Sequence, residues 1–271
     1  MSESGRIHVG HQESRRIHVE HKESRRIHVG VGGWTFEPWR DNFYPKGLPQ
    51  KQELAYAAGK LTAIEINGTF YSTFKPDNFA KWRDETPPGF VFSMKANRFT
   101  THRRDLSTAG ESIERFVNSG IVELKDRLGP IVWQLMPTMQ FDAANIAAFF
   151  ALLPKEVKGA PLRHVLDARH PSFVSEEYLA LARRHGVATV HADSEKYPAI
   201  ADADSDLAYL RLMRTQAELP AGYPAGELQK WAEGAKAWVG KGPGKEVFMF
   251  FISGSKERAP AAAMEMLRIL G

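Results

Sequence analysis

Charged and hydrogen-bonding side chains alternate with apolar ones in several short segments of this 271-residue chain. Glu65, for example, lies between two isoleucines, and Arg211 lies between two leucines. In a β-strand, such alternation gathers the polar side chains on one face. The polar residues of this pattern that are suited to chemistry are Glu65, Asn67, Lys95, Gln134, Asp167, Arg169, Asp193 and Arg211. Carboxylates transfer protons and Lys or Arg binds anions, so the set predicts acid/base chemistry on a small anionic molecule.

Four further residues follow these segments in expected loops. His102 stands beside two arginines, which suits anion binding or proton transfer, although a solvated loop histidine has the same pattern. His170 lies between Arg169 and Pro171, where it either serves the site or braces a turn with a hydrogen bond. Trp34 and Tyr71 either rim a pocket or pack at the end of a barrel. We expect His102 and His170 to take part in catalysis and the two aromatic residues to contact substrate.

The polar residues belong to eight strand-length apolar segments, most of them separated by helical patterns. The segments are 27–31, 63–66, 90–94, 131–135, 164–168, 188–192, 208–212 and 247–251. The helices expected between them include 76–82, one capped by Asp142 that runs to Leu153, 176–184 capped by Ser175, one that carries Trp231 and Trp238, and 261–270. Strands that alternate with helices predict an α/β fold with a parallel sheet.

The spacing of the strands predicts a single-domain (β/α)8 TIM barrel over residues 25–271. The strand centres lie about 31 residues apart, which is one strand–helix unit each. Residues 193–206 are too short and too mixed for a confident helix, so the helix between strands six and seven is expected to be degenerate or missing. An open doubly wound sheet is the alternative fold.

A barrel would turn the polar faces inward and bring them to the carboxyl ends of the strands, where barrel enzymes build their sites. We therefore expect Glu65, Lys95, Gln134, Arg169, Asp193 and Arg211 to surround one mouth. In the sixth strand, Thr189 and His191 share a face with Asp193. Two alternatives are an antiparallel sheet with one solvated face and a barrel whose inner charges form structural salt bridges only.

The composition excludes several classes of protein. The chain has no cysteine, so it has no disulfide, thiol nucleophile or zinc–thiolate site. No run of 18 apolar residues and no apolar signal core is present, so we expect a cytoplasmic protein without a membrane span. The net charge is +4, but residues 1–26 hold six Lys/Arg and four Asp/Glu, leaving 30 and 28 in the remainder. Nucleic-acid binding is therefore possible but not favoured.

Three tandem decamers open the chain, at residues 3–12, 13–22 and 23–32. Only the third copy continues into apolar sequence, so residues 1–24 are expected to form a mobile arm outside the folded domain. The arm carries His8, His11, His18 and His21, which could bind a transition metal adventitiously. We exclude these histidines from the site.

Several motifs together resemble the domain of unknown function 72 family, also called the YecE-like family, whose fold is a TIM barrel. They are Gly-Gly-Trp at 32–34, Trp-Arg at 39–40, Phe-Tyr-Pro at 43–45, residues 64–71, 92–98 with 101–102, 128–135, 169–173, 192–194 and 209–212. The resemblance implies a site from Glu65, Asn67, Lys95, His102, Gln134, Arg169, His170, Asp193 and Arg211, and implies no particular reaction. The chain departs from the family pattern at Ala168, at Met213 and Arg214, and at residues 252–254, which puts the family's activity in this member in doubt.

The first functional hypothesis is an enzyme on a small phosphate- or carboxylate-bearing substrate. Lys95, Arg169 and Arg211 would bind the anion, Glu65 with His102 or His170 would move protons, and Asn67 and Gln134 would orient the substrate. Hydrolase, isomerase and lyase chemistry fit equally. The alternatives are metal-assisted phosphoester hydrolysis and a non-catalytic barrel that binds a ligand or nucleic acid. A divalent metal on Glu65, Asp167, His191 and Asp193 is possible but not favoured; the cofactor and the oligomeric state are not predicted.

Overall fold

Eight parallel strands close into a barrel in the computed structural model, which describes residues 26–271. Around the ring the order is β1–β10–β9–β8–β7–β4–β3–β2, and each strand is hydrogen-bonded to both of its neighbours. The strands are β1 (Ile27–Gly32), β2 (Ala63–Ile66), β3 (Val91–Lys95), β4 (Leu128–Gln134), β7 (His164–Asp167), β8 (Val187–Asp193), β9 (Leu207–Leu212) and β10 (Glu246–Phe251). The TIM barrel is confirmed, and the open sheet is wrong.

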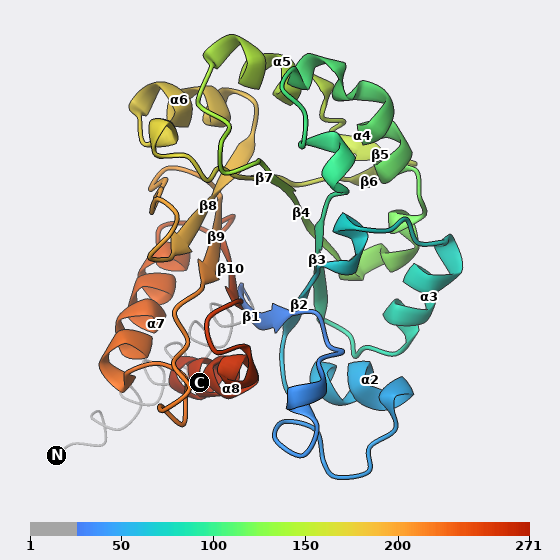
Figure 1. Ribbon diagram of the computed structural model, residues 1–271, viewed down its shortest axis with the longest axis vertical. Coiled ribbons are helices and arrows are strands. Elements are labelled where there is room, and N and C mark those ends of the chain that lie inside the picture. Colours follow the sequence, from blue (N-terminus) through green and yellow to red (C-terminus); the bar gives the residue numbers. More distant parts are fainter. Residues whose placement is uncertain (1–25) are drawn as a thin grey trace, which may run out of the picture.

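The helices pack around the outside of this ring (Figure 1). They are α2 (Glu53–Ala58), α3 (Pro76–Asp84), α4 (Gly110–Val117), α5 (Ala143–Leu152), α6 (Glu176–Arg184), α7 (Ala225–Gly240) and α8 (Ala259–Leu270). Asp142 and Ser175 cap α5 and α6 as predicted, since their side chains accept hydrogen bonds from the backbone N–H of Asn145 and Tyr178.

The sequence patterns did not predict α2, α4 or the hairpin of β5 (Glu156–Val157) and β6 (Ala160–Pro161). These elements have at most eight residues, so each has too few turns for a periodic pattern to repeat. The connection from β8 to β9 contains no helix, as expected. Within residues 26–271, no helix combines the length and the apolar character needed to cross a membrane.

The inner and outer faces of the strands carry different side chains. Inside the ring, an apolar layer contains Val91, Val132, Val165, Tyr209 and Phe248. The larger outer layer packs the other face of the strands against the helices. Because a strand alternates with period two, the inner apolar residues fix which neighbours also point inward. Glu65, Lys95, Gln134, Asp167 and Arg211 therefore belong to the inner face at the carboxyl ends of the strands.

The orientation of β8 differs from the prediction. Its inner residues are Ala188, Val190 and Ala192, which face the large Tyr209 and Phe250 in the inner layer. The polar set therefore points outward, where Thr189 Oγ1 lies 2.8 Å from the hydroxyl of Tyr178 on α6 and the ring of His191 packs on Trp231 of α7. The expectation that Asp193 joins the other five residues around the mouth is wrong.

Candidate active site

The centre of the barrel is a three-strand ion cluster on Arg211. Its guanidinium donates two hydrogen bonds to Glu65, with Nη2–Oε1 at 2.6 Å and Nε–Oε2 at 3.1 Å. The third donor, Nη1, lies 2.7 Å from Oδ2 of Asp167. All three side chains are almost fully buried. Burial alone would raise the pKa of Asp167, but the charges of Arg211 and Arg169 outweigh it and lower that pKa.

Two tyrosines extend the cluster. The Tyr209 hydroxyl donates to Glu65 Oε2 at 2.8 Å and lies 2.7 Å from Ser93 Oγ, and burial followed by the charge of Glu65 raises its pKa. Arg169 donates to Asp167 Oδ2 through Nε and Nη2, at 3.1 and 2.9 Å. The guanidinium of Arg169 also stacks over the ring of Tyr197, 4.3 Å from its centroid. Glu65 thus has both oxygens occupied, whereas Arg169 lies nearer the mouth and is only partly buried.

Lys95 is the cation of the cluster that lacks a carboxylate partner within residues 26–271. It ends β3 on the inner face and is 8% exposed, and its Nζ lies 4.0 Å from the centroid of the Phe70 ring. The carboxylates of Glu65 and Asp167 are engaged by the two arginines instead. Burial, together with the charge of Arg211, lowers the pKa of Lys95 to about 8.

Two amide side chains stand beside the cluster. Gln134 ends β4, next to Asp167 on β7, and its buried Oε1 has no hydrogen-bond partner in the described part of the chain. Asn67 follows β2, and among residues 26–271 its side chain makes only a long bond from Nδ2 to the backbone oxygen of Glu65, at 3.4 Å. Both side chains retain hydrogen-bonding capacity toward the mouth, as a substrate-orienting role requires.

The two candidate histidines occupy different settings. His102 packs edge-on against the Phe70 ring whose face Lys95 covers, at a centroid distance of 5.3 Å. Burial and then the charges of Arg98, Lys95 and Arg169 lower the pKa of His102, so the imidazole is neutral at pH 7. His170 Nδ1 accepts from the backbone N–H of Ser172 at 3.2 Å and lies 2.8 Å from its Oγ. His170 thus braces the turn after β7, while His102 stands within electrostatic reach of the cluster.

Three other predicted residues lie apart from the cluster. Asp193 accepts from Arg214 Nε at 2.6 Å and from the Tyr223 hydroxyl at 2.9 Å, in the outer layer. Trp34 packs against Trp82 and Phe92 on the outer face, with ring centroids 5.2 and 6.3 Å away.

Tyr71, the third of these residues, is 65% exposed. It lines a pocket of about 330 Å³ with Phe99 and Arg103, beside the cluster rather than inside it.

Tyr209, Ser93 and Tyr197 were not predicted as site residues, and Phe70, which like Trp34 and Tyr71 follows a barrel strand, was expected either to line a pocket or to pack at the barrel end. Tyr209 lies two residues before Arg211 on β9, and Ser93 lies two residues before Lys95 on β3, so each points inward like its neighbour. The period-two pattern could therefore have identified both residues. Phe70 follows β2 in a 3-10 turn, and Tyr197 lies in the helix-free connection after β8. No periodic pattern marks those two positions.

The four residues considered for a divalent metal do not converge. Glu65 and Asp167 lie inside the barrel and are bridged by Arg211, whereas His191 and Asp193 point to the outer layer. Within residues 26–271, no three His, Asp or Glu side chains come together in a metal-binding arrangement. The donor set proposed from the sequence therefore does not form one site.

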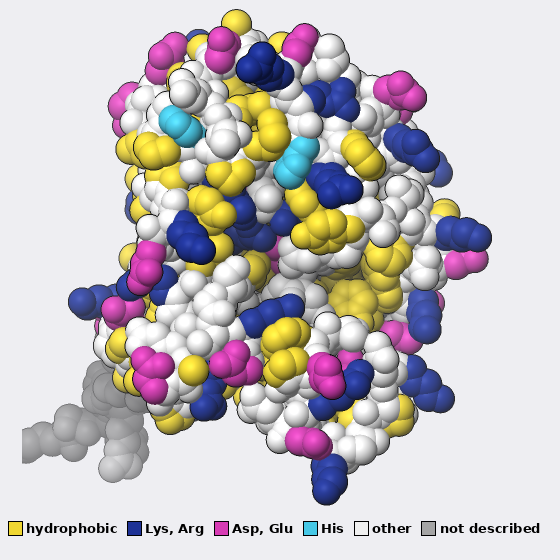
Figure 2. Space-filling model, in the orientation of Figure 1, with side chains coloured by type: hydrophobic (Ala, Val, Ile, Leu, Met, Phe, Trp, Pro, Cys, Tyr) yellow, Lys and Arg dark blue, Asp and Glu magenta, His cyan; other side chains and the backbone are white. Residues whose placement is uncertain are grey.

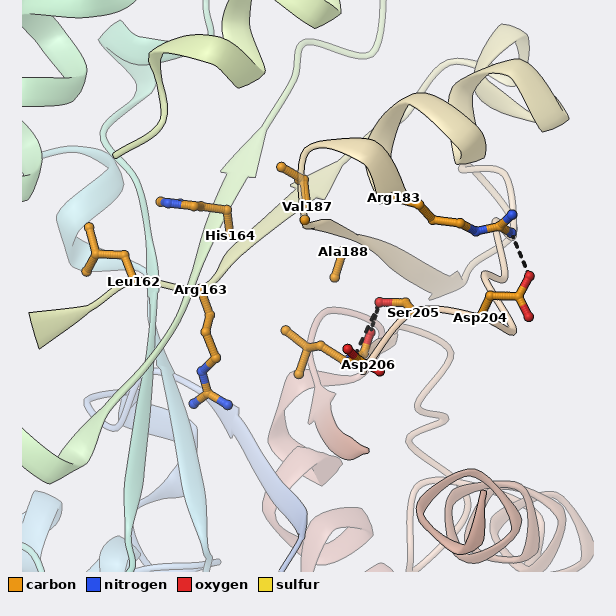
Figure 3. Close-up of a pocket in the computed structure, with 11 residues that line it drawn as sticks. Leu162, Arg163, His164, Arg183, Val187, Ala188, Asp204, Ser205 and Asp206 are labelled. Carbon is orange, nitrogen blue, oxygen red and sulfur yellow. Dashed lines mark hydrogen bonds and ion pairs between the residues drawn. The ribbon is translucent and has the colours of Figure 1, made fainter. Parts of the chain in front are cut away.

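A second polar pocket, of about 280 Å³, opens at the amino ends of β7, β8 and β9 (Figure 3). Its charged side chains are paired with each other or with nearby acids, as Arg183 is with Asp202 and Asp204, and Arg163 with Glu246. Barrel enzymes place their chemistry at the opposite end, and the amino-terminal end serves stability. We therefore assign this pocket no part in the site.

Figure 2 views the molecule in the same orientation as Figure 1, and it shows a hollow near the centre of the molecule with Lys and Arg side chains around and inside it. The closed parallel barrel and the charged cluster at the carboxyl ends of its strands define an α/β protein of the TIM-barrel class, with polar groups where that class builds its sites. The chain belongs to the family described as protein of unknown function DUF72, whose model matches residues 28–271.

Relatives agree with this assignment. The UPF0759 protein YunF of Bacillus subtilis strain 168 is 25% identical over 124 residues, which cover 44% of this chain and 43% of YunF. The DUF72 family protein TM1631 of Thermotoga maritima has a similar structure, with a TM-score of 0.70, 22% identity, and coverage of 90% of this chain and 98% of that one. The DUF72 family protein EF0366 of Enterococcus faecalis is also similar, with a TM-score of 0.68, 16% identity, and coverage of 90% of this chain and 95% of that one. These structures show the shared fold.

Proposed function

We propose that this protein is an enzyme that acts on a small anionic molecule by acid/base chemistry at the carboxyl-terminal mouth of its barrel. The observation that carries the proposal is the charge of the cluster. Lys95, Arg169 and Arg211 contribute three positive charges against the two of Glu65 and Asp167, and the surplus lies on Lys95, which has no acidic partner in the described chain. A buried unpaired cation is costly, and a phosphate or carboxylate would neutralise it.

The geometry gives each residue a role in this proposal. Lys95 and Arg169 bind the anion from the mouth, while Arg211 lies deeper and is committed to Glu65 and Asp167. Burial and neighbouring cations keep His102 neutral, so the imidazole has an unprotonated ring nitrogen that can take a proton from the substrate. Gln134 and Asn67 orient the substrate through their free amide groups.

A non-catalytic ligand-binding barrel is the second candidate, and the state of Glu65 favours it. Both Glu65 oxygens accept hydrogen bonds from Arg211, and one also accepts from Tyr209. A carboxylate whose two oxygens already accept hydrogen bonds within the protein offers no free oxygen to take a proton from a substrate. Under this alternative the mouth binds an anion without turnover.

Thermal unfolding with added anions tests the proposal. A ligand at one hundred times its Kd stabilises the native state by about 2.7 kcal/mol, which raises the Tm of a domain this size by roughly 5–10 °C. We expect phosphate, sugar phosphates or dicarboxylates to raise the Tm. The same sugars without phosphate, and sodium chloride at the same ionic strength, should not raise it. Lys95→Met should abolish the shift.

Lys60→Met is the matched control, because Lys60 also lies over an aromatic ring, that of Tyr56, but precedes β2 at the other end of the barrel. This variant should keep the shift. An anion response that survives Lys95→Met unchanged would remove the basis of the proposal. Turnover of a stabilising compound, followed by product analysis, separates the enzyme from the binding barrel.

A further inference from the structure

We propose that Lys95 is a nucleophile that forms an imine with the carbonyl carbon of an aldehyde or ketone bearing a phosphate or carboxylate. The inference rests on the proposed function for the anionic group, which Arg169 would hold beside Lys95, and adds a carbonyl as a second functional group of the substrate. The protonated imine keeps the positive charge that Lys95 contributes to the mouth. It narrows the reaction class to isomerase or lyase chemistry, since an imine withdraws electrons from a neighbouring C–H or C–C bond.

The contacts of Lys95 differ from those of a structural lysine. A buried ammonium that serves stability is paired with a carboxylate, whereas no carboxylate oxygen of residues 26–271 lies within 4.0 Å of Lys95 Nζ. Its closest described partner is the face of the Phe70 ring, at 4.0 Å. An aromatic face attracts a cation but accepts no full hydrogen bond, so the nitrogen keeps its ability to react.

The arginines account for this lack of a partner. Arg211 and Arg169 supply five hydrogen bonds to Glu65 and Asp167, counting Nε, Nη1 and Nη2 of the first and Nε and Nη2 of the second. The two acids stay close enough to act on Lys95 electrostatically but are held away from it. With its pKa near 8, Lys95 has roughly two hundred times more free amine at pH 7 than an ordinary lysine.

Strand β4, next to the strand of Lys95, carries Gln134, which can bind a polar group of the substrate near the carbonyl. Lys95 pairs in register with Val132, and Gln134 is the next inner residue of β4 beyond it. Gln134 Oε1 is buried without a partner in the described chain, and an acceptor in that state is suited to a hydroxyl or amine donor. A substrate between these two residues would satisfy both.

The step is balanced without any oxidant or reductant. The neutral Nζ forms a bond to the carbonyl carbon, and the π electrons of the carbonyl move to its oxygen, which takes a proton. The nitrogen gives up both of its protons in turn, one on forming the carbinolamine and one on forming the C=N bond. The C–O bond breaks with its electron pair on oxygen, and that oxygen leaves as water with the two protons. An amine and a carbonyl thus give an imine and water, and protonation of the imine nitrogen gives the electron-withdrawing form.

Reductive trapping of the full chain tests the inference. Pyridoxal 5′-phosphate carries an aldehyde and a phosphate, and borohydride converts its imine into a stable secondary amine that peptide mass mapping locates. At limiting reagent and pH 7.5 we expect Lys95 to be labelled at least ten-fold faster than Lys256. Lys256 is the matched internal control, because burial also lowers its pKa and its Nζ lies 4.2 Å from the centroid of the Phe36 ring, outside the ion cluster.

Two comparisons separate this inference from the proposed function. Inorganic phosphate should protect Lys95, and pyridoxal without its phosphate should label it more slowly. Fast labelling by both aldehydes without phosphate protection would support the imine and overturn the anion site. A thermal shift with phosphate but no preference for Lys95 over Lys256 would overturn the imine and leave the anion site standing.

Discussion

Arg211 holds two buried carboxylates, whereas Arg169 contacts one that Arg211 also binds. Arg211→Met would leave Glu65 buried in the barrel core without a cation and Asp167 with Arg169 alone, and removal of one partner from a buried ion cluster costs about 3–5 kcal/mol. Arg169→Met leaves Asp167 paired with Arg211, so we expect it to cost less than about 2 kcal/mol. Urea denaturation of both variants measures the difference. Equal losses would mean that the two arginines share one structural role.

Lys95 couples the stability of the protein to pH. Its pKa is about 8 in the folded chain and about 10.4 when unfolded, so between these values the unfolded chain binds more protons. The free energy of unfolding therefore gains a contribution that rises with pH across this window. Below pH 8 the ammonium is destabilising, and we expect Lys95→Met to be more stable than the wild type at pH 7 by roughly 1–3 kcal/mol.

That advantage should shrink between pH 8 and pH 10, as the wild-type amine loses its proton in the folded state. Denaturation curves of Lys95→Met and of the control Lys60→Met over this range provide the measurement. An advantage that stays constant with pH would contradict the titration of Lys95 and attribute the gain to packing.

The sequence predicted which side chains point into the barrel wherever only one of the two faces of a strand could pack against the helices. Glu65, Lys95 and Arg211 each have apolar neighbours that fill the outer layer, so their own side chains had to point inward. Asp193 failed because both faces of β8 are acceptable to a barrel. Its alanines and valine suit the crowded interior, and its polar residues find partners on α6, on α7 and beyond β9. The space left for β8 inside the barrel depends on the side chains of the other strands, and a local sequence pattern does not contain that information.

At the scale of elements, the approach of β1 to β2 depends on one glycine. A Cβ on Gly30 would lie 1.8 Å from the backbone oxygen of Ala63, which is far inside contact distance. We expect Gly30→Ala to cost more than about 3 kcal/mol or to prevent folding. Gly234→Ala in α7 is the control: no atom lies within 4 Å of its added Cβ, and it should gain up to about 1 kcal/mol.

Chemical denaturation measures the free energy of unfolding of both glycine variants, and soluble yield shows whether they fold. Should Gly30→Ala match the wild type, the two strands would not approach as closely as the register Gly30↔Ala63 requires.

All eight strands were predicted within three residues, because strands buried on two faces have strong apolar signals. The helices with clear caps were predicted as well, as Asp142 and Ser175 illustrate. The missed α2 and α4 follow or precede 3-10 turns, and their first turns carry no capping side-chain bond. Their positions depend on tertiary packing, which a local pattern does not contain.

At the scale of the whole molecule, the third decamer supplies β1, and every residue of that strand is buried. Arg26, just before it, donates to the backbone oxygens of Val239, Gly242 and Lys245 at the end of α7. The arm expected at residues 1–24 lies outside the described residues, and we predict that its removal leaves the barrel intact. The Tm of a chain beginning at Arg25 measures this: a change within a few degrees agrees, and a larger fall would mean that the arm packs on the barrel.

The ring is closed by the pairing of β1 with β10, from Ile27 against Val247 to Val31 against Phe251. On a ribosome this pairing is the last to become available, because almost the entire domain is synthesised between its two partners. Until then the sheet has two open edges, and strand edges without partners are templates for aggregation. The order of synthesis therefore makes β10, which is rich in phenylalanine and pairs directly with the strand of Arg211, the segment whose arrival removes both open edges.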